Sequence, residues 1–442
     1  MTAVGSAPGR RRRLSDTDRR IVSLALPALG ALAVEPLYRL VDTAVIGRVG
    51  TDELGGLAVA VSVLGLVIGG SNFLAYGTTE QVARHLGAGR PVHAARVGVQ
   101  AMWISVIVGA LAVPALVAAA DPLASLLGAD GAVLGHAVEY LRISALGVPF
   151  VLIALGAQGV LRGAADYRTP LVVLVAANVV NLVLELVLVL GFGLGVAGAA
   201  WSTVVAQTGA GVAFLLAIRR RLTAAGSWRP DWDQMRPLAT AGTHLLLRVG
   251  SMLAVFTGST AVAARIDDPT LAAHQICVAM FFFLALTLDA VAVPAQTLVA
   301  DELGRDDRSG ARHIAGRVVA ISLAVGVAVG LAVAAAAPLL ARAFSPDPAV
   351  VSRATVGLLI LALLMLPGAV AFAYDGVFIG AGDYRFLGRA AFAYLLAVVP
   401  LAALVLAVPG LGIAGVWGAL TLWMVLRAAV NHHHLERLLP AR

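Results

Sequence analysis

QGVLRGAADYR (Gln158–Arg168) returns in the second half of the chain as DGVFIGAGDYR (Asp375–Arg385), with seven of the eleven positions identical. The displacement from position 158 to position 375 is called the repeat offset. The same offset relates two further pairs of landmarks: GLGVAG (Gly193–Gly198) with GLGIAG (Gly410–Gly415), and Leu86-Gly87 with Leu303-Gly304. Separate landmarks that share one offset indicate an internal duplication. We therefore expect two similar halves that meet near residues 219–236.

The composition indicates a membrane protein. Of the 442 residues, 60% are apolar and 13% are charged, and the mean hydropathy is +0.91. A soluble domain carries roughly 25% charged residues, so this chain has too much apolar surface to hide inside a water-soluble core. The net charge of +7 sits in short runs between apolar stretches. This is the pattern of membrane loops, and it argues against nucleic-acid binding.

Twelve apolar segments recur along the chain, and each has the roughly 20 residues that a membrane-spanning helix needs. They are predicted near 21–47, 55–82, 97–120, 133–161, 171–190, 195–218, 238–264, 271–299, 314–341, 351–379, 386–406 and 412–429. Because each half holds an even number of spans, both halves enter the membrane in the same orientation. The predicted fold is an all-α polytopic membrane protein with two six-helix bundles, related by a pseudo-two-fold axis along the membrane normal.

The arginines set the expected orientation. They gather in the N-terminal tail (Arg10, Arg11, Arg12, Arg13, Arg19 and Arg20) and in the loops on the same side, whereas the opposite loops hold only Arg48, Arg265 and Arg342. The positive-inside rule then places both termini in the cytoplasm of a multi-pass plasma-membrane protein. The expected parts are an Arg-rich cytoplasmic tail (1–20), an N-lobe (21–218), a cytoplasmic linker (219–236), a C-lobe (237–430) and a cytoplasmic C-terminal tail (431–442).

Ionisable residues inside the predicted spans are the candidate functional residues, because a charge in a bilayer is costly. The first span holds Glu35, Arg39 and Asp42, together with Pro27 and Pro36, which permit bending. A cluster that only neutralises itself remains the alternative. The fifth span places Asn181 and Glu185 four residues apart, on one helix face. A polar stripe that joins helices by hydrogen bonds is the alternative there.

The second half carries Asp289 and Asp375 within its spans. Glu80, His244 and Arg248 lie nearer to span ends, where a structural role is expected; Arg248 could pair with either aspartate. The histidines at 432–434 are expected to be surface residues, and no metal site or cofactor is predicted. The sequence predicts no catalytic residue.

Several of these stretches resemble the multidrug and toxic compound extrusion (MATE) family, specifically its DinF-like branch. They are EPLYRLVDTAVIGRVG from Glu35, FLAYGTTEQVARHLGAG from Phe73, LAAHQI (Leu271–Ile276), LDAVAVPAQTLVADELG (Leu288–Gly304) and DGVFIGAGDYR. The resemblance covers nearly the whole chain apart from the tail. It implies a cation-coupled exporter whose two lobes open alternately to either side.

The resemblance also implies roles for individual residues. Asp42 matches the usual proton or sodium site, with Tyr38, Asn181, Thr203 and Glu185 as its neighbours; the last position is usually Asp. Asp289, Asp375 and Gln296 fall at C-lobe cavity positions. Pro27 and Pro36 match the helix that bends to close the N-lobe cavity.

The expected function is a cation-coupled antiporter, with a proton preferred to sodium, that exports amphipathic, mostly cationic drugs or toxic metabolites as a monomer. Acids in the spans can bind a proton or a cationic substrate in turn. A flippase for a lipid or lipid-linked substrate is the alternative, although its cavity would need arginines. A membrane-embedded enzyme would need a clustered aspartate motif, and a passive channel fits a duplicated bundle less well than a carrier does.

Overall fold

The structure is a computed structural model that describes residues 15–440. Within this range the chain is helical and contains no strand. The arginines at positions 10–13, which the sequence places in a basic tail, lie outside the described residues. The first half comprises α1 (Asp16–Ile46), α2 (Thr51–Gly70), α3 (Phe73–Gly87), α4 (Pro91–Leu126), α5 (Gly131–Ser144), α6 (Val148–Gly163), α7 (Arg168–Glu185) and α8 (Gly195–Leu222).

The second half comprises α9 (Trp232–Ala264), α10 (Asp268–Gly304), α11 (Arg308–Phe344), α12 (Pro348–Ala381), α13 (Tyr384–Ala407) and α14 (Gly412–Leu438). Short helical turns are η1 (Ala145–Gly147), η2 (Leu186–Gly191), η3 (Thr223–Ala225) and η4 (Pro409–Leu411). Because α2 continues into α3, and α5 into α6, the described residues form twelve segments long and apolar enough to cross a membrane. The predicted number of spans is confirmed.

Several helices extend beyond the predicted spans. α1 begins at Asp16, where Ser15 and Asp18 form a capping box. α14 continues to Leu438, through the histidines at 432–434. Residues 16–20 and 431–438 are therefore helical, although the sequence placed them in tails. Hydropathy marks where a chain leaves the hydrocarbon, whereas capping marks where a helix begins or ends, so a span prediction underestimates the length of the helix.

The two halves repeat each other helix by helix. Corresponding helices begin at positions related by the repeat offset: Thr51 and Asp268, Pro91 and Arg308, Gly131 and Pro348, and Gly195 and Gly412. The turns repeat as well, because left-handed backbone recurs at the same offset: Gly89 (φ 69°) and Asp306 (φ 60°), Ala165 (φ 57°) and Gly382 (φ 74°), and Gly195 (φ 53°) and Gly412 (φ 51°). The duplication that the sequence predicts is thus present down to the conformation of single turn residues.

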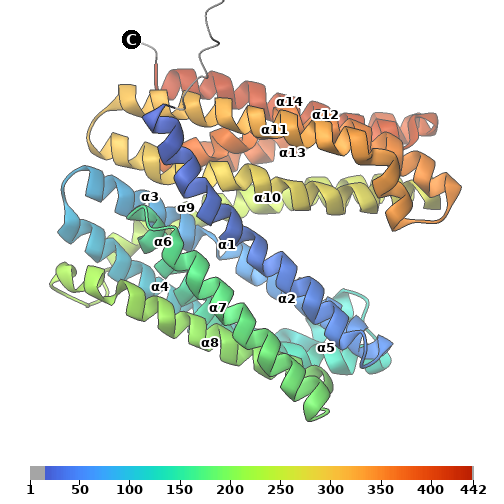
Figure 1. The fold of residues 1–442 in the computed structure, drawn as a ribbon, viewed down its shortest axis with the longest axis horizontal. Helices are drawn as coiled ribbons and strands as arrows, with labels where there is room; N and C mark the ends of the chain where they lie inside the picture. Colours follow the sequence, from blue (N-terminus) through green and yellow to red (C-terminus); the bar gives the residue numbers. More distant parts are fainter. Residues whose placement is uncertain (1–14, 441–442) are drawn as a thin grey trace, which may run out of the picture.

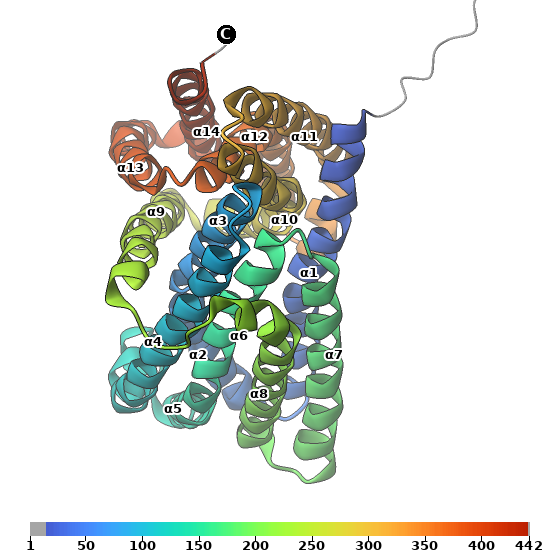
Figure 2. The ribbon, with the colours of Figure 1, turned by 90° about the vertical axis from the view of Figure 1, so that its left-hand side faces the viewer.

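The two halves form separate bundles. Figure 1 shows α10–α14 on one side and α2–α8 on the other, with α1 crossing between them; Figure 2 gives the view from the left-hand end. Each bundle has its own hydrophobic core, one built mainly from residues 45–238 and the other from residues 255–424. We call these bundles the N-lobe (α1–α8) and the C-lobe (α9–α14).

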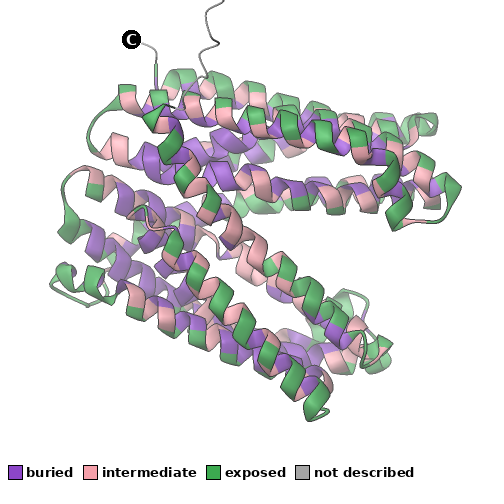
Figure 3. Cartoon of the chain, in the orientation of Figure 1, coloured by how far each residue is buried: buried purple, intermediate pink, exposed green. Residues whose placement is uncertain are grey.

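Apolar side chains also cover the outside of the molecule. Figure 3 shows exposed residues along the outer face of α7, and they include Val172, Val175, Val179 and Val183. Contiguous exposed valines are unfavourable in water and favourable against lipid tails. These faces therefore fit a multi-pass membrane protein.

The lobes approach each other most closely where α3 meets α10. A Cβ added to Gly87 would overlap the carbonyl oxygen of Asp301, and a Cβ added to Gly304 would overlap the carbonyl oxygen of Arg84. Gly87 and Gly304 are related by the repeat offset, as are Arg84 and Asp301. Each half therefore makes the same contact with the other, and the pseudo-two-fold axis passes between them.

Helix α1 contacts both lobes. Near its start, Asp18 accepts two hydrogen bonds from Arg317 of α11, at 2.7 and 2.8 Å. Farther along, Tyr38 bonds to the N-lobe helix α7. Both internal prolines, Pro27 and Pro36, lie between these two attachments, and Pro36 is close to the second one at Tyr38. Since proline removes a backbone donor and weakens the helix locally, α1 can bend where it passes from one lobe to the other.

Candidate functional site

The charged residues of α1 separate onto two faces. Arg39 and Glu35 pair with each other at 2.6 Å, and both side chains are exposed. Asp42 points the other way and is only 4% exposed. The self-neutralising cluster of three that the sequence allowed is therefore reduced to a pair, and Asp42 has no ion pair within residues 15–440.

Asp42 meets Glu185 inside the N-lobe. The Tyr38 hydroxyl donates a hydrogen bond of 2.9 Å to Glu185 Oε2, and the Asp42 carboxyl group lies next to the Glu185 carboxyl group. Glu185 is fully buried. Apart from this approach, Asp42 Oδ1, Glu185 Oε1 and Asn181 Oδ1 accept from no donor in the described residues. The site combines two buried carboxyl groups, a phenol and an amide.

The backbone at Glu185 is irregular. Glu185 is the last residue of α7, and the chain continues as a π-helical turn, η2. Single π-helical turns are rare and are frequently found at functional sites. The extra methylene of Glu185, relative to the aspartate that the resemblance implies, is thus accompanied by a local change in the helix that holds it.

Thr203 lies at the edge of the same site. Its hydroxyl oxygen is 3.4 Å from the hydroxyl oxygen of Tyr140, which belongs to α5. The sequence predicts Thr203 as a site residue and gives no indication of Tyr140. A tyrosine in an amphipathic helix carries no signal of its own, and only the packing of α5 against α8 brings it here.

In the C-lobe, Asp375 has two basic partners. Asp375 Oδ2 accepts from Arg248 of α9 at 2.6 Å and from Arg427 of α14 at 2.8 Å. Of the two pairings left open for Arg248, the structure has the one with Asp375. Arg427 is absent from the predicted site residues, although an arginine inside an apolar span is the same signal that identified the acids. The C-lobe therefore holds two paired arginines beside its acids: Arg248, which the sequence prediction included, and Arg427, which it did not.

The two remaining C-lobe candidates differ from each other. Asp289 is half-buried and forms no ion pair within the described residues. Gln296 is buried, its Oε1 accepts from no described donor, and its backbone packs against Gly380. The structure does not bring either residue into contact with the N-lobe site.

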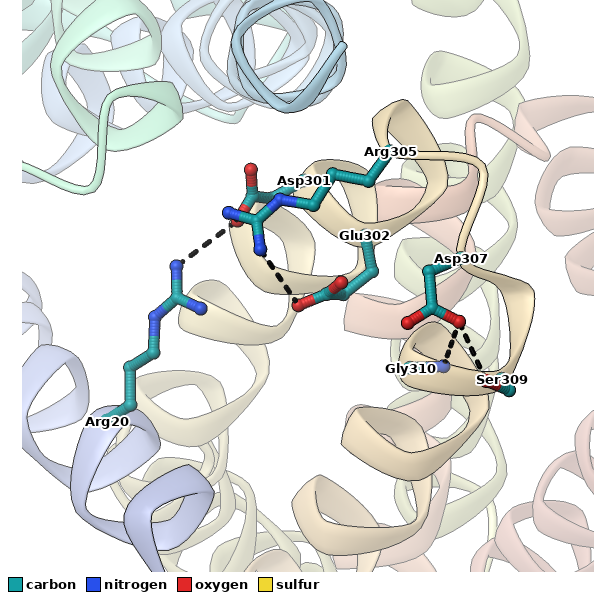
Figure 4. A network of polar contacts seen from close by, with 7 residues as sticks. All are labelled: Arg20, Asp301, Glu302, Arg305, Asp307, Ser309 and Gly310. Atoms are coloured by element: carbon teal, nitrogen blue, oxygen red, sulfur yellow. Dashed lines mark hydrogen bonds and ion pairs between the residues drawn. The ribbon is translucent and has the colours of Figure 1, made fainter. Parts of the chain in front are cut away.

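A network of polar contacts occupies the end of the molecule where α1 begins (Figure 4). Arg20 of α1 and Arg305 both pair with Asp301, at 3.2 and 2.9 Å. Nearby, the backbone N–H of Gly310 and the Ser309 hydroxyl donate to Asp307 and lower the pKa of its carboxyl group. Asp307 thereby caps α11 from the loop before that helix.

The other polar contacts between the lobes lie toward the same end. Glu80 pairs with Arg84 at 2.8 Å and accepts from Tyr384 of the C-lobe at 3.3 Å. The Tyr167 hydroxyl lies 2.7 Å from that of Thr297, again across the lobes. Within residues 15–440, every side-chain hydrogen bond that joins the lobes is found toward this end. Glu80 therefore takes part in a contact between the two lobes.

The sequence and the fold can be compared with those of known proteins. A sequence model of the MatE family matches residues 27–187 and 246–404, one match in each half. The chain belongs to the MatE family. The resemblance to MATE transporters is therefore confirmed, and the chain is a member of a family of multidrug efflux transporters that act on small molecules in membranes.

Individual relatives agree with this assignment. The chain is 31% identical to Protein DETOXIFICATION 44, chloroplastic, of Arabidopsis thaliana, over 92% of this chain and 80% of that protein. It is 28% identical to DNA damage-inducible protein F of Escherichia coli, over 95% and 93%. A crystal structure of a MATE protein in the bent conformation has the same fold, with a TM-score of 0.89, 20% identity and 96% coverage of both chains.

Proposed function

We propose that this MATE protein is a cation-coupled antiporter that exports amphipathic, mostly cationic small molecules by alternating access, with a proton rather than sodium as the coupling ion. The observation that carries the proposal is the approach of Asp42 and Glu185 within the N-lobe. Two neighbouring buried carboxylates repel each other strongly when both are ionised, so one proton shared between them stabilises the pair.

Competition at this pair would couple the proton to the cargo. Neither carboxyl group has a basic partner within the described residues, since Arg39 is held by Glu35. When the shared proton leaves, the site becomes negative and attracts a cation. Transport then requires only that the protonated and the cation-bound states favour different arrangements of the lobes.

Sodium would make different demands. It needs several oxygen ligands around one point. Asn181 could supply one, but the Thr203 hydroxyl is directed toward Tyr140, and the Tyr38 hydroxyl donates its hydrogen bond to Glu185. A proton shared by Asp42 and Glu185 needs no further ligand, so we prefer a proton as the coupling ion.

Alternating access is supported by the uneven contacts between the lobes. Their hydrogen bonds lie toward the end where α1 begins, as do the glycine contacts of α3 and α10. Such an arrangement closes one end of the molecule. At the other end, no side-chain hydrogen bond between described residues links the lobes. The arginine distribution supports a cytoplasmic position for the closed end, with both termini there and the protein in the plasma membrane. We further propose that the protein acts as a monomer, without catalytic activity, cofactor or nucleic-acid partner.

The test is efflux of a fluorescent cationic dye from loaded proteoliposomes. A proton gradient and a sodium gradient are imposed separately, and Asp42→Asn serves as the inactive variant. We expect the proton gradient alone to drive efflux, and the variant to abolish it. Efflux under the sodium gradient alone would reassign the ion. Dye retained under both gradients would contradict drug export, and translocation of a fluorescent lipid in the same vesicles would then support the flippase alternative.

A further inference from the structure

A second polar site lies between the lobes, at the end of the molecule where they touch. It is a cavity of about 540 Å³. The N-lobe contributes the end of α3, including Glu80 and Arg84. The C-lobe contributes the first turns of α9, with Arg236 and His244, and the turn into α13, with Tyr384 and Arg385. No residue of the proposed coupling site lines this cavity.

The two carboxylates around the cavity are already bound. Glu80 pairs with Arg84 and accepts from Tyr384. Asp383 caps α13 by accepting from the backbone N–H of Phe386, and it also accepts from His434 at 2.7 Å. The lining carries three arginines, Arg84, Arg236 and Arg385, against these two carboxylates, so the cavity has an excess of positive charge.

Two arginines at the rim remain available. Arg236 and Arg385 are exposed, and neither forms an ion pair with any residue from 15 to 440. Both belong to the C-lobe, on α9 and α13, whereas the N-lobe side of the cavity presents Gln81 and Arg84 of α3, so a ligand held here contacts both lobes. Two guanidinium groups that converge on one hydrated space provide several donors to an anion, and phosphate oxygens match this geometry well.

Nearby tryptophans indicate the depth of the cavity in the membrane. Trp228 and Trp232 are exposed, and Trp232 lies one helical turn before Arg236. Tryptophan is enriched at the level of lipid headgroups, where its ring is partly in apolar and partly in aqueous surroundings. The cavity therefore opens at the level where lipid phosphates are found.

We propose that this cavity binds the phosphate group of an anionic phospholipid, and that the bound lipid holds the two lobes together at this end. Basic pockets between membrane helices on the cytoplasmic side commonly bind such headgroups. The cytoplasmic placement and the effect on the lobes rest on the proposed function, whereas the binding itself does not. A lipid is preferred to free phosphate because its acyl chains add contacts with the apolar outer faces of α9 and α13.

Binding is measured on the purified full-length protein by native mass spectrometry, with dioleoyl phosphatidylglycerol and dioleoyl phosphatidylcholine as probes. We expect the wild-type protein to retain phosphatidylglycerol preferentially. The double variant Arg236→Gln/Arg385→Gln should bind it about 30-fold more weakly, since each arginine near an anionic headgroup contributes on the order of a tenfold effect or somewhat less.

Three controls make the result specific. Arg219→Gln/Arg220→Gln removes two exposed arginines at the same end of the molecule, on α8, and should retain wild-type binding. Arg236→Lys/Arg385→Lys keeps the charge and should retain most of it, which excludes misfolding as the cause. Inorganic phosphate at millimolar concentration should not displace the lipid. Unchanged binding by the glutamine variant, equal loss in the α8 variant, or displacement by phosphate would each overturn the proposal.

The conformational effect is measured separately. Spin labels at opposite lobes, at the end away from the cavity, report the opening of that end in nanodiscs. Phosphatidylglycerol should increase the fraction of open molecules relative to phosphatidylcholine, and the glutamine variant should not respond. A lipid that binds without this shift would contradict the second part of the proposal. Because neither measurement involves transport, failure of the antiport proposal would leave both results interpretable.

Discussion

The N-lobe site and the same positions of the C-lobe differ at every residue. The repeat offset carries Tyr38, Asp42, Asn181 and Glu185 onto Val255, Ser259, Val398 and Ala402. These four C-lobe residues line a single apolar cavity of about 170 Å³. The same helices in the same arrangement therefore hold two buried acids in one lobe and an apolar hollow in the other.

This difference shows which residues the bundle needs in order to fold and which it does not. The C-lobe folds without acids at these positions, so the bundle does not require them. Carboxyl groups inside a membrane protein are energetically costly, and their presence in one lobe alone agrees with the coupling role that we propose for them. The C-lobe, in contrast, has its charges elsewhere, and three of them, Arg248, Asp375 and Arg427, pair with one another. Arg248, Asp375 and Arg427 correspond to Ala31, Gln158 and Ala210 of the N-lobe.

The largest effect is expected when the N-lobe site is given the C-lobe residue. Asp42→Ser removes the carboxyl group that shares a proton with Glu185, so proton-driven dye efflux from proteoliposomes should fall to the level of protein-free vesicles. The matched control is Ser259→Ala, the same position of the other lobe, which should transport at close to the wild-type rate. Equal loss in both variants would mean that the lobes are functionally equivalent at this position.

The reverse exchange tests the C-lobe charges. Asp375→Gln leaves two arginines without their shared acceptor, and one partner removed from a buried ion pair typically destabilises a protein by about 3 kcal/mol or more. The thermal unfolding midpoint of the purified protein should decrease markedly. Gln158→Ala in the N-lobe removes a neutral side chain that binds Arg162 at 2.9 Å, and it should cost about 1 kcal/mol. A similar decrease in both would show that Asp375 is not the main support of these arginines.

The symmetric contact between the lobes can be broken from one side. Gly87→Ala places a methyl group against the backbone of α10, and the strain should destabilise the closed end by about 2 kcal/mol. Spin-label distances between α3 and α10 should increase. Gly65→Ala is the control, because its Cβ would meet no atom within 4 Å. Unchanged distances in the Gly87 variant would show that the methyl group is accommodated without separating α3 from α10.

The smallest effect is expected at a turn where the halves differ by one residue. Ala165 has a left-handed backbone, whereas its counterpart Gly382 is a glycine. Ala165→Gly should stabilise the protein by about 1 kcal/mol, because left-handed backbone is unfavourable for residues with a Cβ. Gly382→Ala should destabilise it by a similar amount, partly because the new methyl group approaches Glu80. Thermal unfolding midpoints that shift in the same direction would contradict this.

The sequence predicts the fold well because its signals are local and repeated. Hydropathy identifies each span independently, and the repeat offset relates the halves without knowledge of their packing. The site residues on one helix, such as Asn181 and Glu185, follow from helical periodicity. These features need no information about which helices are neighbours.

Contacts between helices are predicted less well. Nothing in the sequence brings Tyr140 to Thr203, or separates Asp42 from Arg39, because the rotation of each helix depends on its packing. Arg427 is a different case, since an arginine inside an apolar span is visible in the sequence and only its partner Asp375 requires the structure. Glu80 was assigned a structural role on the basis of its position in the span, and its bond to Tyr384 of the other lobe required the tertiary structure.

The reciprocal approach of Gly87 and Gly304 has the form of an isologous interface, in which the same patch is used twice about a two-fold axis. Such a contact is typical of two identical subunits. In this chain the linker joins both copies covalently, so their pairing no longer depends on concentration. Each copy can then change its interior separately, as the acids of one lobe and the apolar cavity of the other illustrate, while the shared contact restricts both copies to glycine.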